Sequence, residues 1–420
     1  MMSIPSQTNK LKQVSNGLLR PSTTVSTSAS AFQASRCVFL PPSSRIHTLH
    51  TTQICGSALR NKKHDSELSR PFRATALTDQ ATRPYTTARG TYIKENIYTI
   101  PSSKKDEPTI TAVFENNTGT WQYIVSDPAT SSAVIIDAVL DYDRTTQDIS
   151  TYSADELLVL VNECGLKVDM ILETHIHADH LSAASYLQKR LGKVPIGIGG
   201  RIERMQRMFG QRYGVSENEY KGVFGKLFND DEVFRIGELS AQAVHLPGHT
   251  PDHLGYMVGG LCPSDALYGP MKLLKLTHDI ENVFCGDSVF HIDIGTARCD
   301  FPGGSATDLF HSTRKLLSLS DSTKIWTGHD YPPPGRGAPV PWLSVAEHKK
   351  QNKHLMGDVS AEEFVRVRQE RDKQLAEPKL LHQSLQTNIR GGRLPPPTGE
   401  SGGKEYRFLR VPLKVKGDLW

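Results

Sequence analysis

The chain has 420 residues and a formal net charge of +4, and 37% of its residues are hydrophobic. Together with a mean hydropathy of -0.40, this composition indicates that part of the chain lies outside any packed core. No apolar run approaches the roughly eighteen residues of a membrane-spanning helix, so we expect no membrane span. The six cysteines include no C-x-x-C pair, which argues against a disulfide scaffold and fits a reducing compartment.

The N-terminal segment differs in composition from the rest of the chain. No Asp or Glu precedes Asp65, whereas Lys and Arg are scattered among Ser, Thr and Gln. This pattern is typical of an organelle transit peptide, so we expect residues 1–65 to be a disordered mitochondrial transit peptide that directs the chain to the matrix. A disordered basic tail is the alternative. Because this segment carries much of the net charge, the basic balance does not predict a nucleic-acid partner.

The next segment, residues 66–108, is polar and lacks sustained periodicity, so we expect a linker. Short β-branched and aromatic runs separated by turn residues then predict a β-meander. Farther on, predicted strands and helices alternate, which indicates an α/β domain over residues 109–345. Within this domain, residues 262–278 look like a loop insertion. We expect residues 346–420 to be a C-terminal extension that packs on the domain.

The predicted elements follow from apolar periodicity and from stop signals such as the Gly at position 192. We expect strands at 109–114, 121–125, 133–136, 168–172, 241–246, 254–258, 282–285 and 324–326, and helices at 154–164, 181–191, 307–319 and 361–374.

The segment Thr174-His-Ile-His-Ala-Asp-His180 packs three imidazoles and one carboxylate between a predicted strand and a predicted helix. Such density is typical of metal ligation. His175 and His177 alternate in an extended stretch, so both side chains can face one side of the chain. Asp179 and His180, at the start of the predicted helix, turn toward a neighbouring point. Two adjacent metal sites are therefore geometrically possible.

Three later motifs each place another potential ligand directly after an apolar strand. His249 follows Leu-Pro-Gly, Asp287 follows Cys-Gly, and His329 follows Thr-Gly. Ligands of open α/β sheets bind at the carboxyl ends of the strands, so these side chains can converge on one site. The candidate metal ligands are His175, His177, Asp179, His180, His249, Asp287 and His329.

The order H-x-H-x-D-H, G-H, G-D and G-H-D resembles the metallo-β-lactamase superfamily over about residues 109–331. This resemblance implies an αβ/βα four-layer sandwich. The Arg-x-Asp-Phe segment at Arg298 resembles persulfide dioxygenases of the ethylmalonic-encephalopathy protein type and their bacterial β-lactamase hydrolase-like relatives. Asp330-Tyr331 and residues 388–391 also look like these dioxygenases. Glyoxalase II hydrolases usually show Arg-Phe-Phe-Glu instead.

The resemblance implies a mononuclear Fe(II) held by His175, His249 and Asp287. Such a two-histidine, one-carboxylate set leaves open positions for dioxygen and for a persulfide sulfur, so sulfite and a thiol are the expected products. The small-molecule partners would be O2 and glutathione persulfide or a similar persulfide. The other four candidate ligands, His177, Asp179, His180 and His329, would then orient ligands or hold water.

The main alternative is a hydrolase in which all seven residues bind two zinc ions and a bridging hydroxide attacks a thioester, as in glyoxalase II. A scaffold that has lost catalysis is a third class, and the intact ligand set argues against it. The exact persulfide stays open, because Ala297 and Cys299 replace the Gly and Thr usual around Arg298, and the 262–278 insertion has no recognised counterpart.

Five further residues are candidates for substrate contacts. Arg298 could hold a substrate carboxylate, with Asp300 of the same segment beside it at the substrate site and Arg390 a weaker candidate, but Arg298 could instead form a structural ion pair with Asp300. Tyr331 could hydrogen-bond a ligand near the metal or be a packed aromatic. Cys299 could be a reactive thiol or a small buried hydrophobe. A homodimer is a possible assembly.

Overall fold

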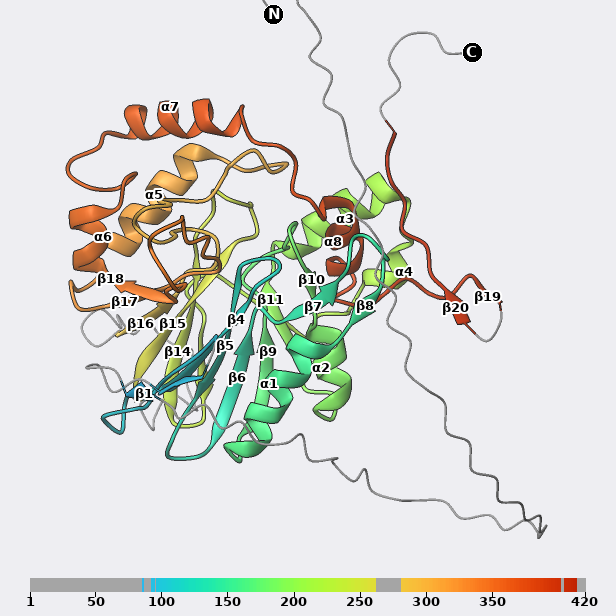
Figure 1. Cartoon of the computed structure of the whole chain (residues 1–420), viewed down its shortest axis with the longest axis horizontal. Helices are drawn as coiled ribbons and strands as arrows, with labels where there is room; N and C mark the ends of the chain where they lie inside the picture. The colour runs from blue at the N-terminus through green and yellow to red at the C-terminus, as the bar shows by residue number, and fades with distance from the viewer. Residues whose placement is uncertain (1–84, 87–91, 95, 262–280, 402–403, 414–420) are drawn as a thin grey trace, which may run out of the picture. The chain divides into compact units, whose positions relative to one another are not determined.

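Two mixed β-sheets form the centre of this computed structural model, with helices on the outer face of each (Figure 1). The structure describes residues 85–86, 92–94, 96–261, 281–401 and 404–413. These belong to one compact unit, Thr78–Trp420. The expected transit peptide (1–65) and loop insertion (262–278) lie outside the described residues.

The first sheet has nine strands in the order β1-β2-β3-β4-β5-β6-β9-β11-β12. Pairing is antiparallel from β1 to β6, and β6, β9, β11 and β12 then run parallel. The strands are β1 (Tyr85–Thr86), β2 (Tyr92–Lys94), β3 (Ile97–Ile100), β4 (Thr109–Glu115), β5 (Thr120–Ser126), β6 (Ser132–Ile136), β9 (Lys167–Leu172), β11 (Ile196–Gly199) and β12 (Lys226–Phe228).

The second sheet has six strands in sequence order, antiparallel except for the parallel pair β16 and β17. They are β13 (Val233–Ile236), β14 (Leu239–His245), β15 (Leu254–Leu261), β16 (Asn282–Phe284), β17 (Lys324–Trp326) and β18 (Trp342–Ser344). The helices α5 (Ala306–Leu317), α6 (Val345–Gln351) and α7 (Ala361–Asp372) lie on its outer side (Figure 1).

Outside the first sheet lie α1 (Tyr152–Glu163), α2 (Ala184–Arg190), α3 (Ile202–Tyr213), α4 (Glu217–Tyr220) and α8 (Leu381–Asn388). A small sheet, β10-β7-β8, consists of β7 (Val139–Tyr142), β8 (Ile149–Ser150) and β10 (Leu181–Ser182). Near the C-terminus, β19 (Gly399–Ser401) pairs with β20 (Lys404–Tyr406).

Three hydrophobic clusters correspond to the three interfaces between the four layers. Along β6, Val134 and Ile136 join the cluster between the sheets, while Ala133 and Ile135 join the cluster under α1, α2 and α3. This alternation follows from the two-residue period of a strand. A third cluster joins the second sheet to α5 and α7 through residues such as Leu309. The αβ/βα four-layer sandwich expected from the resemblance is confirmed.

The expectation of a linker over 66–108 is wrong for its described part. β1, β2 and β3 extend the first sheet beyond β4, and β3 pairs with β4 from Ile97↔Val113 to Ile100↔Ile110. These strands have only two to four residues, so neighbouring-strand pairing rather than local periodicity defines them. The domain therefore begins before residue 109.

The helix expected over 181–191 is shorter than its pattern suggests. Leu181 and Ser182 instead form β10, which pairs with Val139 and Leu140 of β7, and α2 begins at Ala184. Asp179 and His180 therefore lie in a loop and not in the first turn of a helix. The C-terminal extension is partly helical, and α7 and α8 pack on opposite sides of the domain, against α5 and against β10 and α3.

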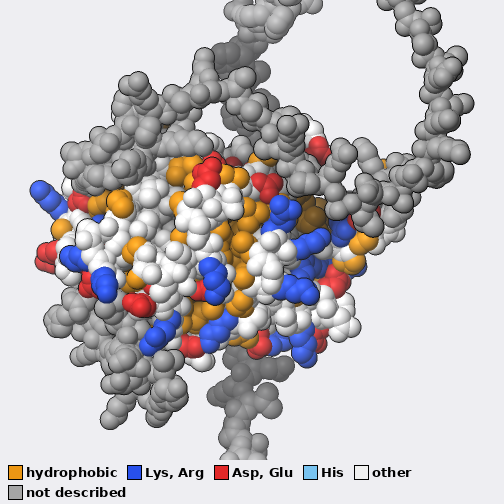
Figure 2. Space-filling model, turned by 90° about the horizontal axis from the view of Figure 1, so that it is seen from below, with side chains coloured by type: hydrophobic (Ala, Val, Ile, Leu, Met, Phe, Trp, Pro, Cys, Tyr) orange, Lys and Arg blue, Asp and Glu red, His pale blue; other side chains and the backbone are white. Residues whose placement is uncertain are grey.

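Among the described residues, no helix is both long and apolar enough to cross a membrane. On the face that Figure 2 shows, Lys and Arg side chains are interspersed with Asp and Glu.

Candidate metal centre

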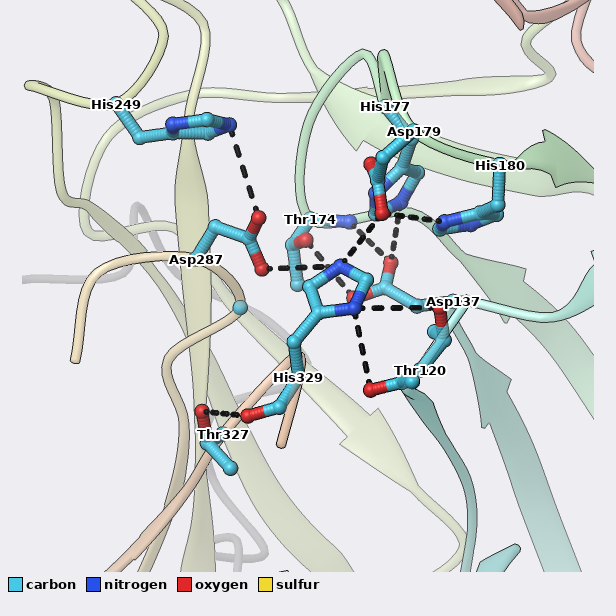
Figure 3. Close-up of polar contacts among 12 residues, drawn as sticks. Thr120, Asp137, Thr174, His177, Asp179, His180, His249, Asp287, Thr327 and His329 are labelled. Carbon is cyan, nitrogen blue, oxygen red and sulfur yellow. Dashed lines mark hydrogen bonds and ion pairs between the residues drawn. The ribbon is translucent and has the colours of Figure 1, made fainter. Parts of the chain in front are cut away.

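The candidate ligands lie on loops that follow the carboxyl ends of four strands. His175 to His180 follow β9, His249 follows β14, Asp287 follows β16, and His329 follows β17. β16 and β17 are parallel neighbours, so their two loops leave the sheet at the same edge. The convergence expected from the sequence is confirmed, and Figure 3 shows the side chains pointing toward a common centre.

One group consists of His175, His249 and Asp287, each of which offers a ligand atom within 4.8 Å of the others. His249 Nε2 lies 3.7 Å from Asp287 Oδ2 (Figure 3). All three side chains are buried, and Nε2 of His175 has no hydrogen-bond partner among the described residues. A buried nitrogen without a partner is costly unless something binds it. This donor set fits a transition metal such as iron or zinc.

Hydrogen bonds on the far side of both imidazoles fix which nitrogen faces the centre. His249 Nδ1 donates to the Arg298 carbonyl at 2.8 Å, because a carbonyl oxygen can only accept. His175 Nδ1 lies 2.9 Å from Thr174 Oγ1, which itself donates to Asp137 Oδ2 at 2.8 Å. The Thr174 oxygen therefore accepts from His175. Both rings thus carry their proton on Nδ1 and leave Nε2 free for a metal.

Burial, reinforced by the neighbouring imidazoles of His177, His253 and His249, holds the pKa of His175 well below its ordinary value. Its imidazole is therefore neutral, the form that binds a metal ion. His253 contacts two members of this group, Asp287 and His175. Its Nε2 accepts the backbone N–H of Asp287 at 3.0 Å, and its ring stacks on His175 with centroids 4.7 Å apart.

A second group, Asp179, Asp287 and His329, shares Asp287 with the first, and its ligand atoms also lie within 4.8 Å of one another. His329 Nε2 lies 3.0 Å from Asp179 Oδ2 and 3.5 Å from Asp287 Oδ1 (Figure 3). Burial opposes a charge on His329, yet the two carboxylates outweigh it and raise the pKa of this imidazole to about 9. The two carboxylates thus favour the protonated form of His329.

His180 extends this second group toward His177. The ligand atoms of His177, Asp179 and His180 lie within 4.8 Å of one another, and neither ring nitrogen of His180 has a hydrogen-bond partner in the described structure. All seven candidate ligands therefore surround one region, which is divided into two neighbouring donor groups.

Two buried carboxylates hold His177. Its Nε2 lies 3.1 Å from Asp137 Oδ1 and 3.1 Å from Glu173 Oε2, while Nδ1 has no hydrogen-bond partner among the described residues. Burial alone would lower the pKa of His177, but Asp137 and Glu173 raise it well above its ordinary value. His177 therefore forms an ion pair with these two carboxylates, and its ligand atoms do not join the group around His175.

Sequence reasoning missed Asp137 and Glu173. The rule that identified the ligands could have found Asp137, because this residue directly follows the apolar strand β6. Its backbone is left-handed, with φ of 53°, and its carboxylate accepts both the N–H and the hydroxyl of Thr174 at 2.8 Å. Glu173 precedes the ligand motif and carries no comparable signal.

Asn388, at the end of α8, supports the ligand loop, a role that sequence reasoning did not assign to it. Its amide hydrogen-bonds three backbone groups of the ligand loop, accepting from Ser182 and donating to His177 and His180, each at 2.9 Å. The sequence pattern at 388–391 was noted, but a role was assigned to Arg390 alone.

The structure places the side chain of Arg390 in an ion pair with Glu219. Its Nε and Nη2 donate to Glu219 at 2.9 and 2.7 Å, and its Nη1 donates to the Gln386 carbonyl. The side chain is buried. Every guanidinium nitrogen is therefore occupied within the protein, an arrangement that favours a structural role for Arg390 over a contact with substrate.

Arg298 lies next to the centre, and its guanidinium forms the ion pair considered as its alternative role. Nε and Nη2 donate to the two oxygens of Asp300, each at 2.6 Å, and Nη1 donates to the Ala376 carbonyl at 2.8 Å.

Cys299 is buried, and burial raises the pKa of its thiol. Cys299 is therefore a protonated core side chain rather than a reactive thiolate.

Tyr331 is the candidate substrate residue that remains accessible. Its ring stacks on His329 with centroids 5.7 Å apart and 7° between the ring planes, and 51% of its surface is exposed. Gly119 packs closely beneath the ring, because a Cβ at that position would lie 2.6 Å from a Tyr331 ring carbon. Gly119 also supplies a carbonyl 3.2 Å from His329 Nδ1. Tyr331 is thus held over the second donor group.

The four-layer sandwich and the convergent histidine and aspartate side chains define a metalloprotein of the metallo-β-lactamase type. The family described as the metallo-beta-lactamase superfamily matches residues 117–260. A β-lactamase hydrolase-like protein of Agrobacterium fabrum is 41% identical over 74% of this chain and 67% of its own length. The chain belongs to the metallo-β-lactamase superfamily.

Two more distant similarities are to proteins named ETHE1. The mitochondrial persulfide dioxygenase ETHE1 of Mus musculus is 26% identical, over 68% of this chain and 89% of its own. The crystal structure of ETHE1 from Myxococcus xanthus aligns with a TM-score of 0.50 and 27% identity, covering 68% of this chain and 99% of that one.

Proposed function

We propose that this protein is an iron-dependent persulfide dioxygenase. It converts glutathione persulfide or a similar low-molecular-weight persulfide, O2 and water into the thiol and sulfite. The outer sulfur loses four electrons, which O2 accepts, and the sulfur–sulfur bond breaks to release the thiol. Such a reaction would remove sulfide-derived persulfide, and the composition of residues 1–65 supports a mitochondrial location for it.

The observation that carries this proposal is that the ligand atoms of His175 and His177 join different groups, although the two rings are neighbours with centroids 4.2 Å apart. His175, His249 and Asp287 form a two-histidine, one-carboxylate set, whereas His177 is paired with Asp137 and Glu173. Fe(II) bound by this set would supply open positions for dioxygen and the persulfide sulfur. The similarity to mouse ETHE1 supports the same assignment.

The surrounding residues have defined tasks in this reaction. Thr174 and the Arg298 carbonyl keep Nε2 of the two ligating histidines toward the centre. His329 Nε2 lies 3.0 Å from Asp179 Oδ2 and 3.5 Å from Asp287 Oδ1, so this imidazole can hold a proton beside the carboxylate ligand. Tyr331, stacked on His329 and half exposed, can contact a substrate that enters above the second donor group.

The second candidate is a zinc-dependent thioester hydrolase, and a specific observation favours it. Asp179, Asp287 and His329 form a donor group adjacent to the first, and Nδ1 of His177 has no hydrogen-bond partner in the described structure. A second zinc ion would use such residues. The Agrobacterium relative, more similar in sequence than mouse ETHE1, is also named as hydrolase-like.

Metal content and oxygen uptake distinguish the two candidates. Protein purified from iron-sufficient cells is analysed for metal and given glutathione persulfide in an oxygen electrode. We expect one iron per chain, O2 consumption and sulfite release, and no reaction with glutathione, which lacks the outer sulfur. Rapid hydrolysis of S-lactoylglutathione without O2 uptake on persulfide would instead establish the zinc hydrolase.

A further inference from the structure

The helix α7 contains a buried ion pair between Arg368 and Asp372. Nε and Nη2 of Arg368 donate to Asp372 Oδ1 at 3.0 and 2.8 Å, and the two side chains are only 2% and 8% exposed. Removing two charges from water costs free energy that their mutual attraction does not always recover. Stability alone therefore does not explain this ion pair, and the hydrogen bonds that it makes to the rest of the protein indicate what it does.

Both members of the pair also hold the segment 296–300, which lies beside the candidate metal centre. Asp372 Oδ2 accepts the backbone N–H of Cys299 at 2.8 Å, and Arg368 Nη1 donates to the Thr296 carbonyl at 2.9 Å. Each carboxylate oxygen of Asp372 thus has one task. One binds Arg368 and the other binds the backbone.

The peptide group between Arg298 and Cys299 connects Asp372 to the metal centre. Its N–H donates to Asp372, and its carbonyl oxygen accepts from His249 Nδ1 at 2.8 Å. The N–H and C=O of a planar trans peptide point in opposite directions. Asp372 and His249 therefore lie on opposite sides of one peptide, in a continuous chain of carboxylate, peptide and imidazole.

We propose that Asp372 is a positioning residue for the metal centre and acts on His249 through this peptide. A carboxylate that binds the proton of a ligating histidine directly fixes the ring and makes it a stronger ligand. Here the charge lies at the N–H end of a peptide, and hydrogen bonds in a chain polarise one another, so the carbonyl becomes a better acceptor for His249.

Arg368 completes the arrangement, because it holds the other oxygen of Asp372 and so fixes the carboxylate. The role belongs to the C-terminal extension, since α7 begins at Ala361, well beyond the last candidate ligand, His329. It does not depend on which metal is bound or which reaction follows. Its test can therefore fail or succeed independently of the proposed dioxygenase activity.

The test is the variant Asp372→Asn, which keeps an acceptor oxygen for Cys299 but removes the charge. Metal-free wild type and variant are titrated with Co²⁺, and the cobalt d–d absorption reports occupancy and ligand field. We expect about tenfold weaker binding, as is typical for loss of an outer-shell partner, and a shifted absorption band. Wild-type affinity with an unchanged spectrum would overturn the proposal.

A matched control removes the same charge beside another buried arginine. Glu219 Oε2 accepts from Nε and Nη2 of Arg390 at 2.9 and 2.7 Å, so Glu219→Gln makes a comparable change on α4. We expect this variant to lose thermal stability but to keep its Co²⁺ affinity. Equal loss of affinity in both variants would assign the effect to general destabilisation and reject the role of Asp372.

A double variant covers the case in which Asp372→Asn does not fold because Arg368 is left unpaired. Arg368→Met combined with Asp372→Asn removes both charges of the ion pair together, which proteins generally tolerate better than removal of one. We expect this protein to fold and to show the same weakened Co²⁺ binding. Wild-type affinity in the folded double variant would overturn the proposal.

Discussion

The side-chain amide of Asn388 donates to the backbone carbonyl of His180 at 2.9 Å, although the two residues lie 208 positions apart in the chain. The same nitrogen donates to the His177 carbonyl, and the amide oxygen accepts from the Ser182 N–H. One buried side chain therefore closes the loop that bears four of the candidate ligands. The helix α8, which carries Asn388, acts as part of the metal centre's support.

The variant Asn388→Asp tests this support with almost no change in shape. A carboxylate oxygen would replace the amide nitrogen and face two carbonyl oxygens, so both donated hydrogen bonds become repulsive contacts. We expect a loss of about 3 kcal/mol in the free energy of unfolding, measured by urea denaturation, and weaker metal binding in a Co²⁺ titration.

Gln386→Glu is the matched control for Asn388→Asp. Gln386 lies on the same helix, and its buried amide donates to the backbone carbonyls of His382 and Arg410 at 2.7 and 2.8 Å. The same chemical change is thus made without contact to the ligand loop. We expect reduced stability but unchanged Co²⁺ affinity, and weakened binding in both variants would contradict a specific role for Asn388.

The contrast between the ligands and Asn388 shows what sequence reasoning could reach. His175, His249, Asp287 and His329 were found because each directly follows an apolar strand, and the sheet topology brings such positions together. Asn388 follows no strand and has no metal-ligating chemistry. Its role exists only because α8 packs against β10, a long-range contact that a local pattern does not encode.

The fold likewise contains elements that local sequence patterns predict and elements that they miss. Long periodic segments such as α1 and α5 were predicted to within two residues at each end. The strands β1, β2 and β3 were missed because they are short and are stabilised by successive pairing, β1 with β2, β2 with β3, and β3 with β4. Leu181 was assigned to a helix because its apolar spacing fits a helical period, although pairing with Leu140 holds it in β10. Local propensity is overridden where tertiary pairing supplies the hydrogen bonds.

Ligand removal should distinguish one metal from two. We expect His249→Ala and Asp287→Ala each to abolish metal binding and activity, because each removes a member of the group around His175. His329→Ala should weaken activity but keep most of the metal. The measurement is metal content per chain in purified variants. Loss of a second metal equivalent in the His329 variant would support the two-zinc hydrolase.

Acid should destabilise the protein through His348, which lies on α6 away from the candidate ligands. Burial lowers the pKa of this imidazole from 6.5 to about 4. Between these values the unfolded chain binds a proton that the folded chain does not. Stability is therefore complete above pH 6.5 and falls as the pH decreases to about 4, by about 3 kcal/mol.

The variant His348→Gln removes this titration, so the fall in unfolding free energy between pH 7 and pH 4.5 should be smaller than in wild type. Urea denaturation at the two pH values measures it. His311→Gln serves as the control, because His311 is exposed on α5. If His348→Gln and wild type lose stability equally, burial of His348 does not cause the acid sensitivity.

The N-terminal segment should direct the chain to mitochondria and be dispensable for folding. This prediction rests on the absence of Asp and Glu before Asp65. Fluorescent fusions of the full chain and of residues 66–420 are compared by microscopy. We expect mitochondrial signal only for the full chain, and a cytosolic full-length fusion would contradict the targeting role.

Arg298 allows a direct test of whether its guanidinium binds substrate or holds the protein together. In the structure it binds Asp300 and the Ala376 carbonyl, so a substrate carboxylate would have to replace Asp300. If the ion pair is structural, Arg298→Met should cost about 1 kcal/mol of stability, as for other partly exposed pairs, and leave KM for glutathione persulfide within about threefold of wild type.

A substrate role for Arg298 predicts a different result. An arginine that contributes equally to ground-state and transition-state binding would raise KM by an order of magnitude or more at unchanged kcat. Steady-state O2 uptake measures both constants, and we expect the structural outcome because each of the three guanidinium nitrogens already donates a hydrogen bond within the protein.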